Sequence, residues 1–281
     1  MPTRVQVPAL LAVASAVGLL LTWFASYGVG VTSRADRGVQ QGFIGLDDTR
    51  AAELAERVAH LVDPRPFAIM AAALVAVALI RRRPRLALAA GVILAGANVT
   101  TQILKRVTVE PRAYDLATWS GGMGDELWPS GHTTAVMTLV LCLILVSSHR
   151  LRPVVAALGA LFVVAVVYSI MLLAWHLPSD VLGGFLVATG WTLAAVALLQ
   201  GAELRWPTAD RREPPVQLTA VLAPAAAVAI CCVAAVGAIA LARPDSAMAH
   251  AVQHSAFVLG APLIGAAALA LSTGVAVSLR R

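Results

Sequence analysis

The first chemical signal in this sequence is a pair of basic residues at the end of an apolar segment. Lys105 follows the apolar run at 86–104 and precedes Arg112 by seven positions. Both side chain types bind phosphate oxygens through charge-assisted hydrogen bonds. Lys105 is the single lysine among 21 basic residues. A lone lysine at a helix end can equally be an interfacial cation that reaches the lipid headgroups, so its interpretation depends on the residues that accompany it.

The second signal is the sequence Ser130-Gly131-His132, which stands at the start of the apolar run at 131–147. Ser130 suits a helix N-cap, and Gly131 lets a ligand approach the backbone. The free N–H groups and the dipole of a helix start bind anions. His132, in the first turn, is placed to give a proton to a leaving oxygen. Without the other signals, the same residues would indicate only a capped helix.

The third signal is His176 followed by Asp180. At this i, i+4 spacing the carboxylate can bind Nδ1 of the imidazole, which orients the ring and leaves Nε2 as a nucleophile or base. Ser179 or Asp180 could instead only cap the next helix. Together, the three signals have the composition of a phosphate clamp, a general acid and an oriented nucleophile.

The composition predicts that most of this chain lies in a lipid bilayer. The 281 residues are 59% hydrophobic and 13% charged, with a mean hydropathy of +0.81, unlike a soluble domain. One crossing needs about 20 apolar residues, so about eight crossings use nearly the whole chain. We therefore predict an all-α, polytopic transmembrane helical bundle. The predicted spans are 7–27, 67–80, 86–104, 131–147, 154–175, 181–200, 217–242 and 255–279.

The arginines predict the orientation of these spans. They gather after the second, fourth and sixth spans and at the C-terminus, at Arg81, Arg82, Arg83, Arg85, Arg150, Arg152, Arg211, Arg212, Arg280 and Arg281. Because cytoplasmic loops are rich in arginine, both termini are expected in the cytoplasm of a multi-pass cell membrane protein. The three signals lie in loops that two crossings separate, so they share one face, predicted to point outward. The chain has a net charge of +6, but its basic residues do not form the continuous stripe typical of nucleic-acid-binding proteins. No nucleic-acid partner is therefore expected.

The remaining segments carry less chemistry. We divide the chain into an N-terminal part at 1–85, a core at 86–200 and a C-terminal part at 201–281. The first span is expected to be a retained anchor. In the N-terminal part, 48–62 has the apolar spacing of a helix that lies on the membrane surface or covers other spans.

Histidine and cysteine residues outside the three signals predict no metal site. His250 and His254 have i, i+4 spacing, but no third ligand accompanies them. The three cysteines lie in apolar runs and are expected to be small core residues, with no disulfide.

The three motifs together resemble the type 2 phosphatidic acid phosphatase (PAP2) superfamily over about 86–200. Its pattern is Lys, six residues and Arg, then Pro-Ser-Gly-His, then His-x-x-x-Asp. The resemblance implies metal-independent hydrolysis without a cofactor, in which His176 attacks phosphorus, Asp180 holds that ring, and His132 protonates the leaving group. It also implies that Lys105, Arg112, Ser130 and Gly131 hold the phosphoryl oxygens, and that water then hydrolyses the phosphohistidine.

The sequence departs from the family pattern at two places. Pro111 precedes Arg112, where the family has proline after the arginine. Ile170 follows Ser169 where the third motif has arginine, so one phosphate ligand is absent. Losing one such donor costs about 10²- to 10³-fold in rate, which leaves catalysis feasible. Arg106 is a hypothetical replacement.

We therefore predict a membrane phosphohydrolase that removes phosphate from a lipid phosphate or polyprenyl pyrophosphate. Its partners are the substrate and membrane lipids, and its oligomeric state is not predicted. One alternative is a noncatalytic lipid-phosphate binder or transporter that retains the site but lacks the arginine. Another is a vanadate-dependent haloperoxidase, because those enzymes share the resembling pocket.

Overall fold

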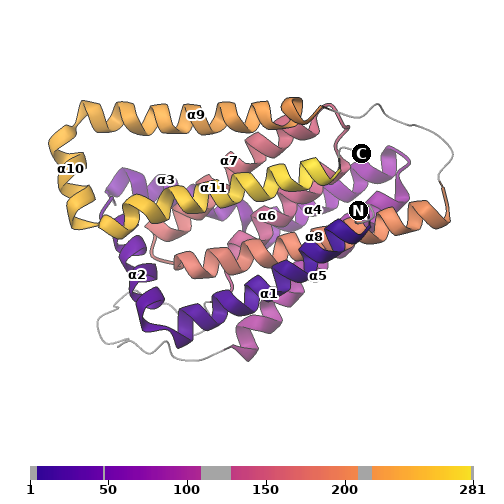
Figure 1. Ribbon diagram of the computed structural model, residues 1–281, viewed down its shortest axis with the longest axis horizontal. Coiled ribbons are helices and arrows are strands. Elements are labelled where there is room, and N and C mark those ends of the chain that lie inside the picture. Colours follow the sequence, from indigo (N-terminus) through magenta and orange to yellow (C-terminus); the bar gives the residue numbers. More distant parts are fainter. Residues whose placement is uncertain (1–4, 47, 109–127, 208–216, 280–281) are drawn as a thin grey trace.

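The computed structural model describes residues 5–46, 48–108, 128–207 and 217–279, and every regular element within them is a helix. Most of the long helices run along the long axis of the molecule, and α10 crosses one end (Figure 1). The predicted all-α bundle is confirmed. In chain order the helices are α1 (Gln6–Gly28), α2 (Gly30–Ile44), α3 (Thr49–Ala59), η1 (His60–Val62), α4 (Pro64–Ile80), α5 (Pro84–Val107), α6 (Gly131–Val146), α7 (Arg152–Leu172), α8 (Pro178–Arg205), α9 (Leu218–Ala242), α10 (Pro244–Gln253) and α11 (Ser255–Ser278).

Each of the eight predicted spans corresponds to one helix. Six of them, α1, α5, α7, α8, α9 and α11, are long and apolar enough to cross a membrane. The segment of α3 and η1 meets α4 at a bend of 48°, and together they would make a seventh span. Helix α6 is apolar but has only 16 residues, fewer than a usual crossing.

Helix α6 occupies the centre of the bundle. It packs against α4, α5, α7, α8 and α11, and nearly all of its side chains are buried. Two glycines of α8 allow the start of α6 to come close. A Cβ atom on Gly184 would lie 2.8 Å from Cβ of Thr133 and 3.0 Å from the carbonyl oxygen of Ser130. A Cβ atom on Gly183 would lie 2.9 Å from Cβ of Pro129.

Arginines tie several helix ends together at the end of the bundle where the chain begins and ends (Figure 1). Arg81 donates to the carbonyl of Val146, and Arg152 donates to the carbonyl of Leu279. Such bonds satisfy carbonyl groups that a helix C-terminus leaves unpaired. The arginines of the loops after α4 and α6 therefore share one face, as expected. Arg211, Arg212, Arg280 and Arg281 lie outside the described residues, and the assignment of this face to the cytoplasm stays a prediction.

The segment between α1 and α4 contains one helix more than expected. Helix α3, with η1, confirms the helix predicted at 48–62, and α3 packs against α7 as a covering helix would. Helix α2 was not predicted. It contains glycines and many polar residues, which weaken the apolar pattern, yet it buries Val39, Gln40 and Phe43 and packs on α7 and α11. Tertiary packing stabilises this helix more than its intrinsic propensity does.

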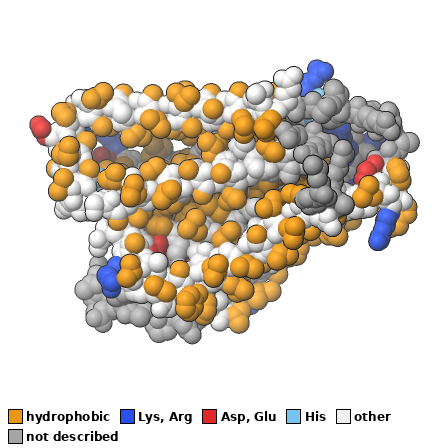
Figure 2. Space-filling view, viewed as in Figure 1, with side chains coloured by type: hydrophobic (Ala, Val, Ile, Leu, Met, Phe, Trp, Pro, Cys, Tyr) orange, Lys and Arg blue, Asp and Glu red, His pale blue; other side chains and the backbone are white. Residues whose placement is uncertain are grey.

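Helix α9 lies at the periphery and buries little of its surface. Hydrophobic side chains line its visible face (Figure 2). Cys231 and Cys232, on this helix, are exposed, whereas Cys142 in α6 is buried. The prediction that all three cysteines belong to the core was therefore wrong for two of them. In a membrane bundle an apolar helix can contact lipid instead of protein, so apolarity alone does not predict burial.

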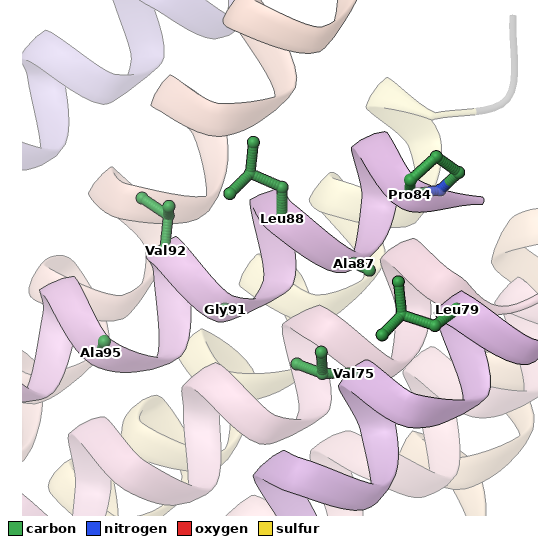
Figure 3. A pocket seen from close by; sticks show the side chains of 8 residues that line it. All are labelled: Val75, Leu79, Pro84, Ala87, Leu88, Gly91, Val92 and Ala95. Carbon is green, nitrogen blue, oxygen red and sulfur yellow. The ribbon is translucent and has the colours of Figure 1, made fainter.

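A shallow groove lies between α4 and α5 (Figure 3). Its lining is apolar throughout, from Val75 and Leu79 of α4 to Ala95 of α5. Ala95 lies ten residues before Lys105, which is about 15 Å along the helix axis. The groove is therefore separate from the three polar motifs.

Candidate active site

The start of α6 forms one wall of the candidate site. Ser130 is its N-cap and is fully buried. Its Oγ accepts from the backbone N of Thr133 at 3.3 Å and from Oγ1 of Thr133 at 3.0 Å. The predicted capping role is confirmed, and a role of Ser130 toward phosphate stays a prediction. The backbone N of Ser130 donates to the carbonyl of Asp180 at 2.9 Å, so this wall is joined to the start of α8.

A cation and an amide converge on Gly131 from the last turns of α5. A Cβ atom on Gly131 would lie 3.8 Å from Nε2 of Gln102 and 4.0 Å from Nζ of Lys105. Lys105 thus meets the end of α6 whose N–H groups favour an anion, as predicted. Gln102 was not predicted, although its i, i+3 spacing to Lys105 places both on one helix face. These donors can hold the oxygens of an anionic group.

His176 and Asp180 form the second wall. Asp180 is completely buried and His176 is 6% exposed. The Nδ1 atom of His176 lies 3.4 Å from Oδ2 of Asp180, within ion-pair distance but without hydrogen-bond alignment. The same Oδ2 accepts from the backbone N of Leu177 at 2.9 Å. Asp180 therefore combines the two predicted roles, because it caps α8 and lies beside the imidazole.

The two predicted histidines approach each other. The ring centroids of His132 and His176 are 6.5 Å apart. Trp175 packs beside His132, with ring centroids 5.5 Å apart. The structure therefore brings together five of the seven predicted positions directly, namely Lys105, Gly131, His132, His176 and Asp180, with Ser130 behind Gly131.

Arg112 lies outside the described residues. Arg106 is exposed in the last turn of α5, and its replacement of the absent arginine stays a prediction. Ile170 is fully buried among apolar side chains of the core. An apolar side chain at this position adds packing but no phosphate ligand.

Part of the chain matches a known protein family. A model of the PAP2 superfamily matches residues 86–204, from α5 to α8. We refer to this matched segment, residues 86–204, as the PAP2 core. The fold is similar to the crystal structure of the first transmembrane PAP2 type phosphatidylglycerolphosphate phosphatase from Bacillus subtilis, with a TM-score of 0.50 and 16% identity. The similarity covers 71% of this chain and 98% of that one. A search of curated proteins found no match.

Helix α2, which precedes the PAP2 core in the chain, supports the segment that carries His176. Asp36 accepts from the backbone N of Ser179 at 2.8 Å and from Oγ of Ser179 at 2.6 Å. Gln40 is fully buried, and its Nε2 donates to the carbonyl of His176 at 2.8 Å. Asp36 and Gln40 are four residues apart, so both project from one face of α2. Sequence reasoning missed them because their partners lie more than a hundred positions away.

We expect Asp36→Ala to lower both stability and activity. The substitution leaves the N–H and hydroxyl of buried Ser179 without their acceptor, which costs about 1–3 kcal/mol. Movement of the His176 turn by about 1 Å can reduce kcat up to about 100-fold. Thermal unfolding in detergent and phosphate release measure the two effects. Asp36→Asn keeps one acceptor oxygen, so its stability and activity are expected to be intermediate between those of the wild type and Asp36→Ala. Reduced stability with unchanged kcat would contradict a positioning role.

A second carboxylate approaches the PAP2 core from the turn before α4. Oδ1 of Asp63 lies 3.3 Å from Nε2 of His132, and Oδ2 of Asp63 lies 2.8 Å from Nδ1 of His60. Burial opposes ionisation of Asp63, but the hydrogen bonds from the two histidines outweigh it and hold the pKa of this carboxyl below its ordinary value. The hydrogen bond to Asp63 in turn raises the pKa of His60. Asp63 is therefore present as a carboxylate at neutral pH.

Proposed function

We propose that this protein is an integral membrane phosphohydrolase that acts on a lipid phosphate or a polyprenyl pyrophosphate through a phosphohistidine intermediate. The PAP2 core and the apolar helices support the coarser conclusion, a membrane lipid phosphatase. The observation that carries the proposal is the approach of His176, with Asp180 beside it, to His132 at a ring separation of 6.5 Å. One group can supply the nucleophile and the other the proton.

In the proposed first step, Nε2 of His176 attacks phosphorus while the bond from phosphorus to the leaving oxygen breaks. Asp180 stabilises the positive charge that develops on the His176 ring. His132 gives its proton to the leaving oxygen. In the second step, neutral His132 takes a proton from water, the resulting hydroxide oxygen attacks phosphorus, and the P–N bond breaks. The products are the dephosphorylated lipid and inorganic phosphate, and both histidines return to their starting states.

Phosphate binding in this proposal relies on Lys105, Gln102 and the N–H groups at the start of α6, with Arg112 as a further ligand. Lys105 neutralises negative charge, and Gln102 adds a neutral donor near Gly131. Ile170 supplies no donor, so we expect transition-state stabilisation to be weaker than in a site with arginine there. No step needs a metal ion, and metal-independent turnover is expected.

The position of the site supports a lipid substrate. Lys105 and His132 lie where apolar helices α5 and α6 meet polar segments, so an amphiphile can keep its tail in lipid while its phosphate reaches these side chains. The site lies at the opposite end of α5 from the arginine-rich loops. By the distribution of arginines, this end faces outward.

The experiment that tests the proposal is phosphate release by detergent-purified protein in the presence of EDTA. The substrates are phosphatidic acid, phosphatidylglycerophosphate, a polyprenyl pyrophosphate and a prenyl-linked sugar phosphate, with a mock purification as the control. Release from at least one lipid is the expected result. Lipid transport by reconstituted vesicles without any release would favour the noncatalytic alternative, which the missing arginine motivates. Halide oxidation that requires vanadate and peroxide would favour the haloperoxidase alternative.

A further inference from the structure

We propose that Asp63 is a positioning residue for His132, so that each of the two histidines of the site has its own carboxylate. The inference rests on the proposed function and assigns a role to a residue outside the matched PAP2 core. Asp180, within the core, serves His176 in this arrangement. Asp63, from the turn between η1 and α4, serves His132.

The geometry around Asp63 restricts both the carboxylate and the ring that it contacts. Its two oxygens face two different imidazoles, Nε2 of His132 at 3.3 Å and Nδ1 of His60 at 2.8 Å. A carboxylate can only accept, so each of these nitrogens carries a proton. Two partners, one on each oxygen, fix the plane of the carboxylate. The ring of His60 in turn packs against the ring of Trp175, and their centroids are 5.8 Å apart.

This contact determines which nitrogen of His132 is available for chemistry. Because Asp63 binds Nε2, the nitrogen left to exchange a proton with a substrate is Nδ1. Trp175 packs beside the ring of His132 and limits its rotation. The same logic of a carboxylate that selects the tautomer and orientation of an imidazole operates in hydrolase triads.

The charges around His132 make the carboxylate necessary. His132 is partly buried, and Lys105 and His176 lie close enough to oppose a positive charge on its ring. A general acid must nevertheless carry a proton before the leaving group departs. Among the described residues, Asp63 is the acidic group that contacts His132 and can offset those neighbours. Without Asp63, burial and the neighbouring Lys105 and His176 would all disfavour a protonated His132 ring.

Two substrates with different leaving groups can distinguish a positioning role of Asp63 from a merely structural one. An alkoxide that departs from a lipid phosphate monoester needs a proton, whereas p-nitrophenolate departs readily without one. We expect Asp63→Asn, which keeps the shape but removes the charge, to lower kcat/KM for dioctanoyl phosphatidic acid, which reports the step that expels the leaving group, about 10- to 100-fold. For p-nitrophenyl phosphate we expect the loss to stay within about threefold. Asp63→Glu should restore part of the activity toward the lipid.

The controls separate this role from a folding defect. Glu53→Gln neutralises an exposed carboxylate on neighbouring α3 and should leave both rates unchanged. Thermal unfolding in detergent reports whether each variant is folded. An equal loss for both substrates would overturn the inference and indicate a structural role. Unchanged rates would also overturn it. A higher rate with the lipid would overturn it too, because the carboxylate would then compete with the leaving group for Nε2.

The wild-type protein distinguishes failure of this inference from failure of the proposed function. Wild-type hydrolysis of both substrates, combined with any of the three overturning results for Asp63→Asn, would reject the inference alone. Absence of wild-type phosphate release from every lipid of the panel would reject the proposed function and this inference with it.

Discussion

Replacement of His176 by alanine is expected to lower the rate of phosphate release by about 10⁴-fold or more, because removal of a nucleophile costs this much in hydrolases. His176 lies almost completely buried between Asp180 and the centre of the site, where no exposed histidine can substitute for it. Phosphate release from the best lipid of the panel measures the effect. Water would then have to attack the lipid phosphate directly, so the residual rate would rest only on substrate binding and charge stabilisation by the remaining residues.

A matched control for this variant is His254→Ala. His254 precedes α11, and its ring packs against His250 at a centroid distance of 4.6 Å, apart from the residues assigned to the site. The control should retain wild-type activity. Rapid acid-free quenching with ³²P-labelled substrate should trap a phosphoenzyme, stable to base and labile to acid, in the wild type and not in His176→Ala. A labelled His176→Ala protein would assign the nucleophile to another residue.

The second large effect is expected for Asp180→Asn, with kcat lowered about 10³- to 10⁴-fold, as for the equivalent substitution in a serine protease triad. The carbonyl oxygen of asparagine can still accept from the backbone N of Leu177. It carries no charge, however, and cannot stabilise the imidazolium that forms when His176 attacks. The amide group also presents a donor to Nδ1 and favours the wrong tautomer. The loss should therefore appear in kcat more than in KM.

Asp245→Asn is the comparison for this experiment. Asp245 also lies in the first turn of a helix, α10, so both substitutions remove a favourable interaction with a helix dipole. Of these two carboxylates, Asp180 is the one that lies beside His176. Similar losses in the two variants would contradict the assigned role of Asp180, as would a large loss confined to KM.

Several parts of the site were predictable because their signals are local. The spacing of His176 and Asp180 predicted a contact within one turn, and the structure places the two side chains 3.4 Å apart. Ser130 was predicted as an N-cap because serine before an apolar run stabilises a helix start. Lys105 was predicted to meet His132 because both belong to one loop between spans. The roles of these residues in hydrolysis remain proposals.

The supporting residues were not predictable for the opposite reason. Gln40 and His176 are 136 positions apart, and Asp63 and His132 are 69 positions apart. A hydrogen bond between such distant residues leaves no periodicity or motif in either segment. Read alone, Gln40 and Asp63 are ordinary polar residues in the segment between the first two predicted spans.

By itself, the sequence determined the class of the protein, the positions of its apolar helices and the face on which the three polar motifs meet. These properties follow from the length and spacing of apolar residues, because lipid requires helices that satisfy their own backbone. Tertiary structure alone decided which helices are central and which face lipid, as the buried Cys142 and the exposed Cys231 illustrate. It also decided that Asp36 and Asp63 reach the segments that carry His176 and His132. Apolar helices are equally stable against protein and lipid, so only their packing and their long-range polar contacts select the arrangement.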